Sequence, residues 1–232
     1  MARDILRVID TQINRWRAEQ RQRESEPTEA PASLPDAVCI SNSFGAQGAV
    51  VAALVGERLQ LPVYDREIVA HIAQTAHVHV ETVETLDQRA LSRIDDFVTA
   101  LFRERAFDLN DYVRTLTRTV AALWGHGPCV LVGHGAVHIV PRDHRVAVRV
   151  VGAVPDRVRR VMALKGLDEK EARRLVQRTD AEREGFHRRG FGAWVDDPVA
   201  YDLIVNTSSL PISVCATVIV DAYRAKFAAG SP

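Results

Sequence analysis

The chain has 232 residues, of which 47% are hydrophobic, which is enough for one α/β domain with a sizeable core. Its 30 basic side chains balance its 30 acidic ones, so no overall field favours nucleic acid or an anionic membrane surface. We find no apolar run of about 18 residues and a charged N-terminal stretch, so we expect neither a membrane span nor a secretory signal.

The N-terminal residues, 1–21, have the pattern of an amphipathic helical arm, and residues 22–36 are rich in Pro, Glu and Ser, which is typical of a linker. We therefore expect the arm to be separate from a main domain over residues 37–227. Its apolar stripe should pack either on that domain or, more readily, on a second copy of the chain, giving a homo-oligomer. The stripe consists of Ile5, Leu6, Ile9, Ile13 and Trp16.

The segment from Ala37 to Leu59 organises the domain. A short apolar strand at 37–41 is followed by a glycine-bearing turn, Ser43–Gly48, and then by an apolar helix. Such a turn presents free N–H groups and a helix N-terminus to a phosphate group. It departs from the phosphate-loop pattern G-x-x-x-x-G-K-[ST], because Ala49 replaces the Lys and no hydroxyl residue follows to hold a magnesium ion. By itself, the turn is equally compatible with an ordinary strand–helix connection.

Further strands are expected at 129–132, 146–151 and 202–206, with a short extended segment at 61–65. Because helical patterns alternate with these strands, we predict a mainly parallel sheet covered on both faces. A helical insertion should span 66–124, with Asp65 as its first cap and breaks near 77–79, 90 and 107–110.

The C-terminal half begins with an Arg-rich helix that should start at Asp156 and stop at Gly166. Asp168 should open the next helix, with Glu171 completing a capping box. A last helix should run to about Phe227.

The three cysteines, Cys39, Cys129 and Cys215, lie far apart in apolar runs and have neither CxxC nor metal-ligand spacing. We interpret them as reduced core residues of a cytoplasmic protein.

Three strings in order along residues 37–225 carry a resemblance to a known family. They are ISNSFGAQG followed by LQLPVYDREIV, then CVLVGHGAVHIV with VAVRVVGAVPDRVRRV, and finally EARRLVQRTDAEREGFHRRGFG with WVDDPVAYDLIVNTSSL. Together they resemble the cytidylate-kinase-like branch of the nucleoside monophosphate kinases, which are P-loop proteins. The resemblance implies a three-layer α/β domain, ATP and Mg²⁺ as cofactors, and a nucleotide or small phosphorylated substrate.

The resemblance also implies roles for individual residues. A lid at about 172–195 would close over the transferring phosphoryl group, because phosphoryl transfer needs mainly positioning and cations. The implied phosphate-binding residues are Ser43, Gly45, Ala46, Gln47 and Gly48. The implied acceptor-binding residues are Asp65, Arg66 and His134, and the implied catalytic residues are Asp180, Arg183 and Arg188, with His187 and Arg189 beside them.

Three cationic positions of the family pattern are neutral or only conditionally charged here. Ser41-Asn42 stands where relatives have Ser-Arg, Ala49 replaces a basic residue, and Gly133-His134-Gly135 replaces a Gly-Arg motif. Removing one such group costs roughly 3 kcal/mol of transition-state stabilisation. Other arginines would have to substitute, and the candidates are Arg142, Arg145, Arg149 and Arg178.

His134 and His138 have a spacing that would suit two metal ligands, but no Glu accompanies them as in H-E-x-x-H, so we predict no metal site. Three hypotheses for the function follow. The chain is an active kinase that transfers a phosphoryl group from ATP to CMP or a related small acceptor, a nucleotide-binding pseudokinase that regulates or binds partners, or a structural protein whose site has decayed. The glycine turn and the D-x-x-R spacing argue against the third.

Overall fold

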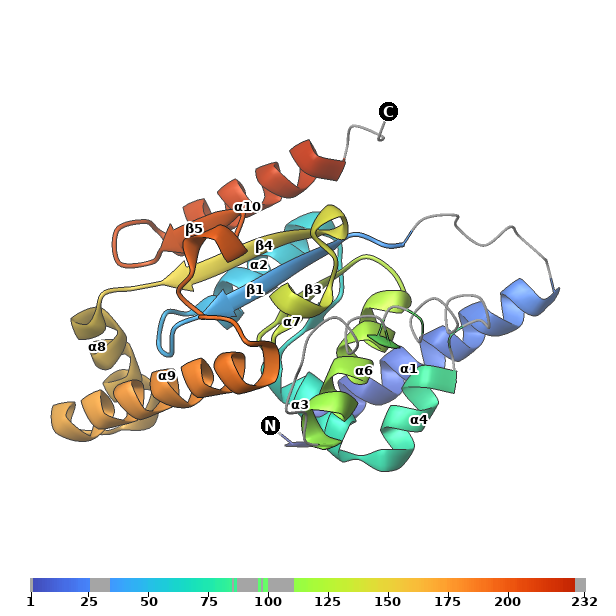
Figure 1. The fold of residues 1–232 in the computed structure, drawn as a ribbon, viewed down its shortest axis with the longest axis horizontal. Coiled ribbons are helices and arrows are strands. Elements are labelled where there is room, and N and C mark those ends of the chain that lie inside the picture. The colour runs from blue at the N-terminus through green and yellow to red at the C-terminus, as the bar shows by residue number, and fades with distance from the viewer. Residues whose placement is uncertain are drawn as a thin grey trace.

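A parallel sheet forms the middle of three layers, with helices packed on both of its faces (Figure 1). This computed structural model describes residues 2–25, 34–84, 86, 96, 98–99 and 111–227. The predicted helix breaks near 90 and 107–110 lie outside the described residues. None of the described helices is long and apolar enough to cross a membrane.

The described strands form one sheet in the order β2–β3–β1–β4–β5, and every neighbouring pair is parallel. The predicted strands and their mainly parallel arrangement are therefore confirmed, with each end displaced by no more than about one residue. The strands are β1 (Ala37–Asn42), β2 (Val63–Tyr64), β3 (Cys129–Val132), β4 (Arg145–Val151) and β5 (Leu203–Asn206).

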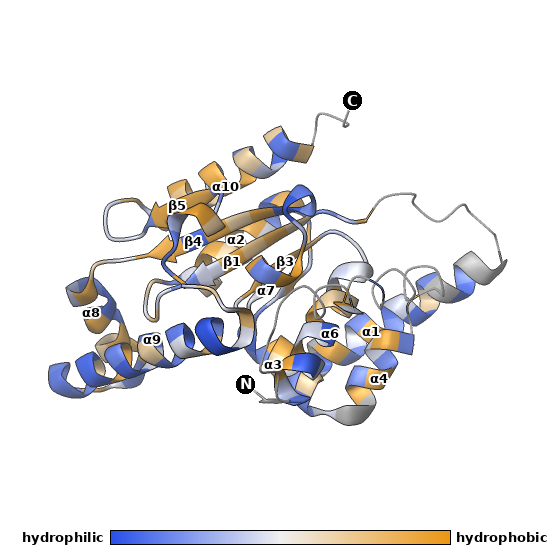
Figure 2. Ribbon diagram, viewed as in Figure 1, coloured by the Kyte–Doolittle hydropathy of each residue, from blue (hydrophilic) through white to orange (hydrophobic). Residues whose placement is uncertain are grey.

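Helices α2 (Gly48–Leu59) and α10 (Ile212–Phe227) cover one face of the sheet. Strand residues alternate between the faces, so Val38 and Ile40 pack against these two helices while Ala37 and Cys39 face the opposite layer. Figure 2 shows hydrophobic residues concentrated in β1, β3, β4 and α2, as expected for strands that are buried on both sides.

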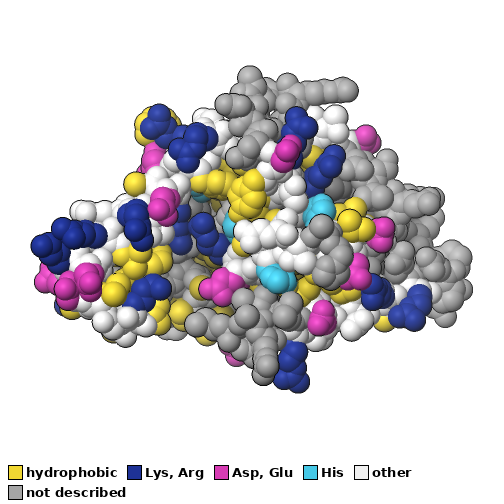
Figure 3. Space-filling model, turned by 90° about the horizontal axis from the view of Figure 1, so that it is seen from below, with side chains coloured by type: hydrophobic (Ala, Val, Ile, Leu, Met, Phe, Trp, Pro, Cys, Tyr) yellow, Lys and Arg dark blue, Asp and Glu magenta, His cyan; other side chains and the backbone are white. Residues whose placement is uncertain are grey.

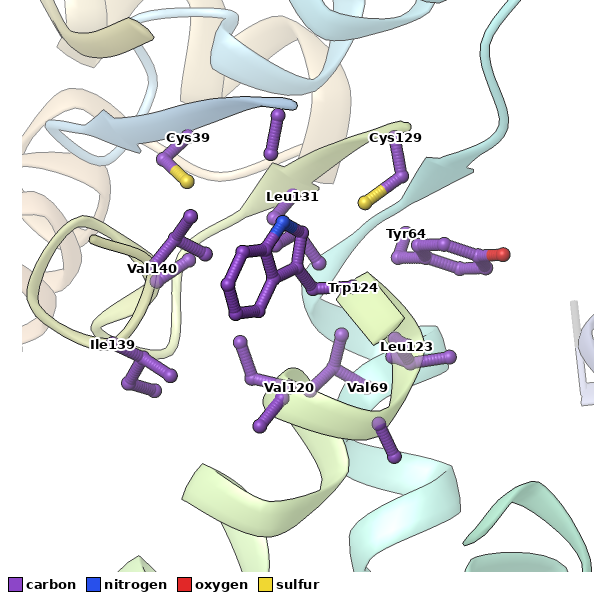
Figure 4. Close-up of a cluster of buried hydrophobic side chains, with 14 of the residues drawn as sticks. Cys39, Tyr64, Val69, Val120, Leu123, Trp124, Cys129, Leu131, Ile139 and Val140 are labelled. Atoms are coloured by element: carbon purple, nitrogen blue, oxygen red, sulfur yellow. The ribbon is translucent and has the colours of Figure 1, made fainter. Parts of the chain in front are cut away.

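The opposite face is covered by α6 (Asp111–Gly125) and the short α7 (Ala136–Ile139), with α3 (Arg66–Gln74) and α4 (Ala76–Glu84) packed beside them. Trp124 is fully buried at the centre of this layer, among aliphatic side chains and the thiols of two strands (Figure 4). Its indole Nε1 donates a hydrogen bond to the Pro35 carbonyl at 2.6 Å, so the aromatic ring also fixes the entry to β1.

The predicted break at residues 77–79 is wrong, because α4 already begins at Ala76. The interruption lies at Thr75, which has an extended backbone. The His79 N–H donates to the Thr75 carbonyl at 3.0 Å, which closes the first turn of α4 across the predicted break. The Asp65 cap is confirmed, since its carboxylate accepts the N–H groups of Glu67 and Ile68.

Helix α1 (Ala2–Ser25) is longer than expected and is not separate from the core. Ile9, Ile13 and Trp16 are buried in the same cluster as Trp124, and the Trp16 ring stacks on His126 with 3.8 Å between ring centroids. The linker predicted from residue 22 therefore cannot begin before residue 26. Because its own chain already covers the described part of the stripe, the structure does not support self-association through the arm.

Helices α8 (Val154–Lys165) and α9 (Glu169–Phe191) form an antiparallel pair at the carboxyl end of the sheet (Figure 1). Helix α8 begins before the predicted Asp156, because Pro155 suits the first turn of a helix. The stop at Gly166 and the capping box of Asp168 with Glu171 are both confirmed. Two short 3₁₀ turns, η1 (Arg142–His144) and η2 (Pro198–Ala200), precede β4 and β5.

The burial of α1 predicts that Trp16→Ala destabilises the whole domain. Truncating a buried aromatic residue of this size costs about 3–5 kcal/mol, which urea unfolding followed by circular dichroism would measure. Asn14→Ala, at an exposed position of the same helix, is the control and should change the unfolding free energy by less than about 0.5 kcal/mol. Equal stability of the two variants would show that α1 does not belong to the core.

Candidate functional site

A cavity of about 990 Å³ lies where the carboxyl ends of β1 and β3 meet helices α3, α8 and α9. Parallel strands direct their carboxyl ends to one edge of a sheet, which is where α/β proteins bind ligands. Seen from below in Figure 3, charged and histidine side chains gather beside hydrophobic ones on one face of the molecule. Three of the five predicted phosphate-binding residues, Gly45, Gln47 and Gly48, line the cavity, whereas Ser43 and Ala46 do not. The three predicted acceptor residues all line it.

The glycine turn, Ser43–Gly48, is held in a fixed shape by its own backbone. The Ser43 N–H donates to the Val150 carbonyl of β4 at 3.0 Å, and the Ala46 N–H donates to the Ser43 carbonyl at 3.1 Å. Gly45 and Gln47 both have positive φ, 79° and 59°. Four further N–H groups have no hydrogen-bond partner among the described residues, although their residues line the cavity; they belong to Gly45, Gln47, Gly48 and Ala49.

Gly45 and Gly48 are required by close packing. A Cβ atom on Gly45 would lie 2.9 Å from the Arg157 carbonyl oxygen of α8, and one on Gly48 would lie 2.5 Å from the Asn42 Cβ. The Asn42 side chain therefore packs directly against the start of α2.

Two charged side chains grip the turn at Phe44. The Asp180 carboxylate of α9 accepts the Phe44 N–H at 2.8 Å, and the Arg157 guanidinium donates to the Phe44 carbonyl at 3.0 Å. Arg157 and Asp180 also pair with each other at 2.5 Å. Arg157 is buried, so this side chain of the Arg-rich helix faces the glycine turn and not the solvent.

Arg160 and Arg183 reach the cavity from opposite sides of the turn. Arg160 donates to the Thr207 hydroxyl at 3.0 Å, and that hydroxyl donates to the Ala46 carbonyl at 3.1 Å. Arg183 donates to the Asn42 carbonyl, and its buried Nε has no partner among the described residues. Burial, with Arg66 nearby, lowers the pKa of Arg183 to about 10, so Arg183 remains a cation at neutral pH.

Of the four arginines proposed as substitutes, only Arg149 reaches this site. Its buried guanidinium donates to the hydroxyls of Ser41 and Ser43 at 3.2 Å each. The other three lie elsewhere: Arg142 bonds the Val199 carbonyl, Arg145 bonds the Val140 carbonyl, and Arg178 pairs with Glu182 on the exposed side of α9.

The three predicted acceptor residues come together as expected from their positions. The imidazole Nε2 of His134 lies 2.9 Å from the Arg66 carbonyl oxygen, and Asp65, Arg66 and His134 all line the cavity. His134 adopts a left-handed backbone, φ 52°, between two glycines that do the same. This turn directs the imidazole toward α3 rather than toward a metal partner.

A second buried imidazole, His187, lines the cavity one turn along α9 from Arg183. Its Nδ1 lies 2.9 Å from the Nε2 of His138, and Phe191 packs beside both rings. Burial lowers the pKa of His187 to about 4, and Arg149 and Arg183 add to the effect. Burial likewise lowers the pKa of His134 to about 4. Both side chains are therefore neutral at pH 7.

His134 and His138 face different elements, since His134 lies beside the Arg66 carbonyl of α3 and His138 beside the His187 imidazole of α9. Among the described residues no group of three or more His, Cys, Asp or Glu side chains could hold a metal ion.

Arg188 does not belong to the site in this structure. Its guanidinium lies over the exposed ring of Trp194, 4.6 Å from the centroid, outside the residues that line the cavity. The prediction missed Arg157, Arg160 and Thr207, which contact the glycine turn or line the cavity. For the two arginines a signal existed, since the helical repeat of α8 places Arg157 and Arg160 beside the apolar Val158 and Val161.

A glycine turn between the first strand and its helix, with arginines converging on it from β4, α8 and α9, defines an α/β protein equipped to hold phosphoryl groups. The comparison with family models then identifies the group. Residues 37–209 match the cytidylate kinase-like family, so the chain belongs to that family.

Two solved structures are similar to the chain, and the first of them shows the same fold. An uncharacterized protein from Eubacterium ventriosum ATCC 27560 is similar at 20% identity with a TM-score of 0.65, over 82% of this chain and 98% of that chain. Shikimate kinase from Bacteroides thetaiotaomicron is similar at 14% identity with a TM-score of 0.43, over 83% of this chain and 98% of that chain. No curated protein sequence matches the chain significantly.

The two neutral imidazoles predict acid sensitivity. An unfolded His titrates near pH 6.5, whereas His134 and His187 titrate at about 4 in the folded state, so the unfolded chain binds more protons between these values. The contribution of the two neutral imidazoles to the free energy of unfolding should be fully present above pH 6.5. It should be lost as the pH drops toward 4, by up to roughly 1.4 kcal/mol per pH unit for each imidazole. Urea unfolding between pH 7 and pH 5 measures this slope. His187→Gln should make it shallower; an identical slope would exclude His187 as a source.

The contact between Gly48 and Asn42 predicts a rescue. Gly48→Ala should destabilise the fold by about 1–3 kcal/mol through overpacking. Asn42→Gly removes the side chain that the new methyl group would meet, so the double variant should recover part of that loss. A double-mutant cycle of unfolding free energies measures the coupling. Strict additivity would show that the two side chains do not compete for this space.

Proposed function

We propose that this protein is a nucleotide-dependent phosphotransferase that transfers a phosphoryl group from ATP to CMP or a related small acceptor. Membership of the cytidylate kinase-like family supports kinase-type chemistry. We also propose CMP or a related small molecule as the acceptor and the cytoplasm as the compartment.

The observation that carries this proposal is the set of N–H groups at the start of α2 that have no hydrogen-bond partner in the described part of the chain. Gly45, Gln47, Gly48 and Ala49 line the cavity with backbone donors, and the positive end of the helix dipole lies behind them. Backbone donors bind phosphate oxygens without a Lys, so the Ala49 substitution leaves this part of the site intact. Arg183 of α9 adds a cation beside these donors. Its guanidinium donates a hydrogen bond to the carbonyl of Asn42, the last residue of β1.

The residues at the helix start do not fit the usual Mg²⁺ site. Ala49 and Val50 supply no oxygen ligand where the phosphate-loop pattern has a Ser or Thr. We therefore assign the protein no magnesium ligand at this position, and Mg²⁺ would accompany ATP only through the nucleotide's own phosphates. Turnover should accordingly be slow.

The alternative is a pseudokinase that binds nucleotide and regulates or binds partners without turnover. One observation favours it: the Asp180 carboxylate already occupies the Phe44 N–H and the Arg157 guanidinium, two groups that could otherwise bind phosphate. Both hypotheses predict nucleotide binding, and only the first predicts transfer.

The test combines calorimetric binding of ATP and CMP with chromatographic detection of ADP and CDP. Wild type should bind ATP, and Arg183→Ala should lower kcat by about a hundredfold or more, because a cation that faces the transferring group is lost. Arg173→Ala is the matched control, since Arg173 is on the same helix and pairs with Glu169, and neither residue lines the cavity. It should leave kcat unchanged.

The outcomes separate the hypotheses. Binding without detectable CDP supports the pseudokinase. Brisk turnover that Arg183→Ala does not affect would show that the site is wrongly assigned, and failure of wild type to bind either nucleotide would reject the proposed function.

A further inference from the structure

Arg149 is a buried cation at the carboxyl end of β4, with only 7% of its side chain exposed. It lies directly beside Ser41 in the register between β1 and β4. A guanidinium at such a place is costly to desolvate unless hydrogen bonds and a counterion compensate. The Ser41 and Ser43 hydroxyls supply the hydrogen bonds; Ser41 lines the cavity, and Ser43 is the first residue of the glycine turn.

The counterion is Asp196, in the segment between α9 and η2, and its side chain is 71% exposed. Both Nε and Nη2 of Arg149 donate to the same oxygen, Oδ1, at 3.1 and 2.8 Å. The pair therefore lacks the two-oxygen fork that makes an Arg–carboxylate bond strong. An exposed carboxylate can return to water at small cost, whereas the buried guanidinium cannot.

The surroundings of Arg149 also favour a negative ligand. Its charge helps to lower the pKa of both Arg183 and His187, so its field reaches the cavity wall that these side chains form. Val195, next to Asp196, lines the same cavity. A movement of Asp196 away from Arg149 would thus take place at the edge of the site.

We propose that Arg149 is a further phosphate-binding residue, and that Asp196 is its resident counterion, which an entering phosphoryl group displaces. A phosphoryl group offers two oxygens to the guanidinium fork where Asp196 offers one. The inference rests on the proposed function, because it places the phosphoryl group of a nucleotide at Ser41. Arg149 would then supply a buried cation next to Asn42, the position at which this chain has an uncharged residue.

The test is the affinity for ATP and, separately, for CMP, measured by calorimetry on the full chain. Asp196→Asn should bind the ligand that contacts Arg149 about two- to fivefold more tightly, because the exposed carboxylate no longer competes for the guanidinium. Asp197→Asn removes the same charge one residue further on, at an exposed position, and should leave both affinities unchanged. The nucleotide that responds shows whether Arg149 holds a donor or an acceptor phosphate.

Arg149→Met should weaken binding of that same nucleotide about ten- to a hundredfold, because hydrogen bonds to a charged partner are lost. In the Arg149→Met background Asp196→Asn should then have no effect. If Arg149→Met does not fold, the comparison of Asp196→Asn with Asp197→Asn still decides.

The inference alone is overturned if wild type binds nucleotide and Asp196→Asn binds it no more tightly than Asp197→Asn does. If neither wild type nor Asp196→Asn binds ATP or CMP, the proposed function and this inference are both wrong.

Discussion

The ion pair between Arg157 and Asp180 is the interaction on which the arrangement of the site depends. It connects α8 to α9 and holds Phe44 of the glycine turn by its N–H and its carbonyl at once. A turn that leaves four N–H groups unpaired has little internal support, so its shape must be imposed from outside. Because α9 supplies one of the two gripping side chains, any displacement of α9 changes the turn as well.

The cavity is lined by several arginines and by two histidines that carry no charge, so its basic residues are not all positive. Arg66, Arg160 and Arg183 border it, while Asp65 and Asp180 balance part of the charge. Desolvation keeps His134 and His187 uncharged, which avoids adding two more positive groups to a crowded region. An anion that entered the cavity would reduce the repulsion among these arginines, which act on one another at close range.

Local signals in the sequence were sufficient to predict the strands of the sheet and most of the helix ends. The apolar strand runs, the caps at Asp65 and Asp168 and the stop at Gly166 each depend on neighbours within a few residues, and all are found in the structure. The gathering of Gly45, Gln47, Gly48, Asp65 and His134 around one cavity was implied by the family resemblance, and it agrees with the rule that parallel strands bring their carboxyl ends together.

Contacts between distant segments could not be predicted in the same way. A run of arginines in a helix has the same pattern whether a given side chain is solvated or, like Arg157, buried against a turn more than a hundred residues away. The stripe of α1 identified a buried face, but it could not show that Trp16 would stack on His126 of its own chain. Asp196 lies in an irregular segment, where no periodicity marks a side chain as a counterion.

The three thiols are distributed over the layers in a way that makes them reporters of local opening. Cys39 is in the central strand, Cys129 begins a neighbouring strand and Cys215 is in α10; all three are free and buried. Burial raises the pKa of each thiol, to about 12 for Cys39, so alkylating reagents find almost no thiolate in the closed protein. The modification rate of each cysteine therefore measures how often its own layer opens, and the unaltered chain carries probes that can distinguish movement of the sheet from movement of α10.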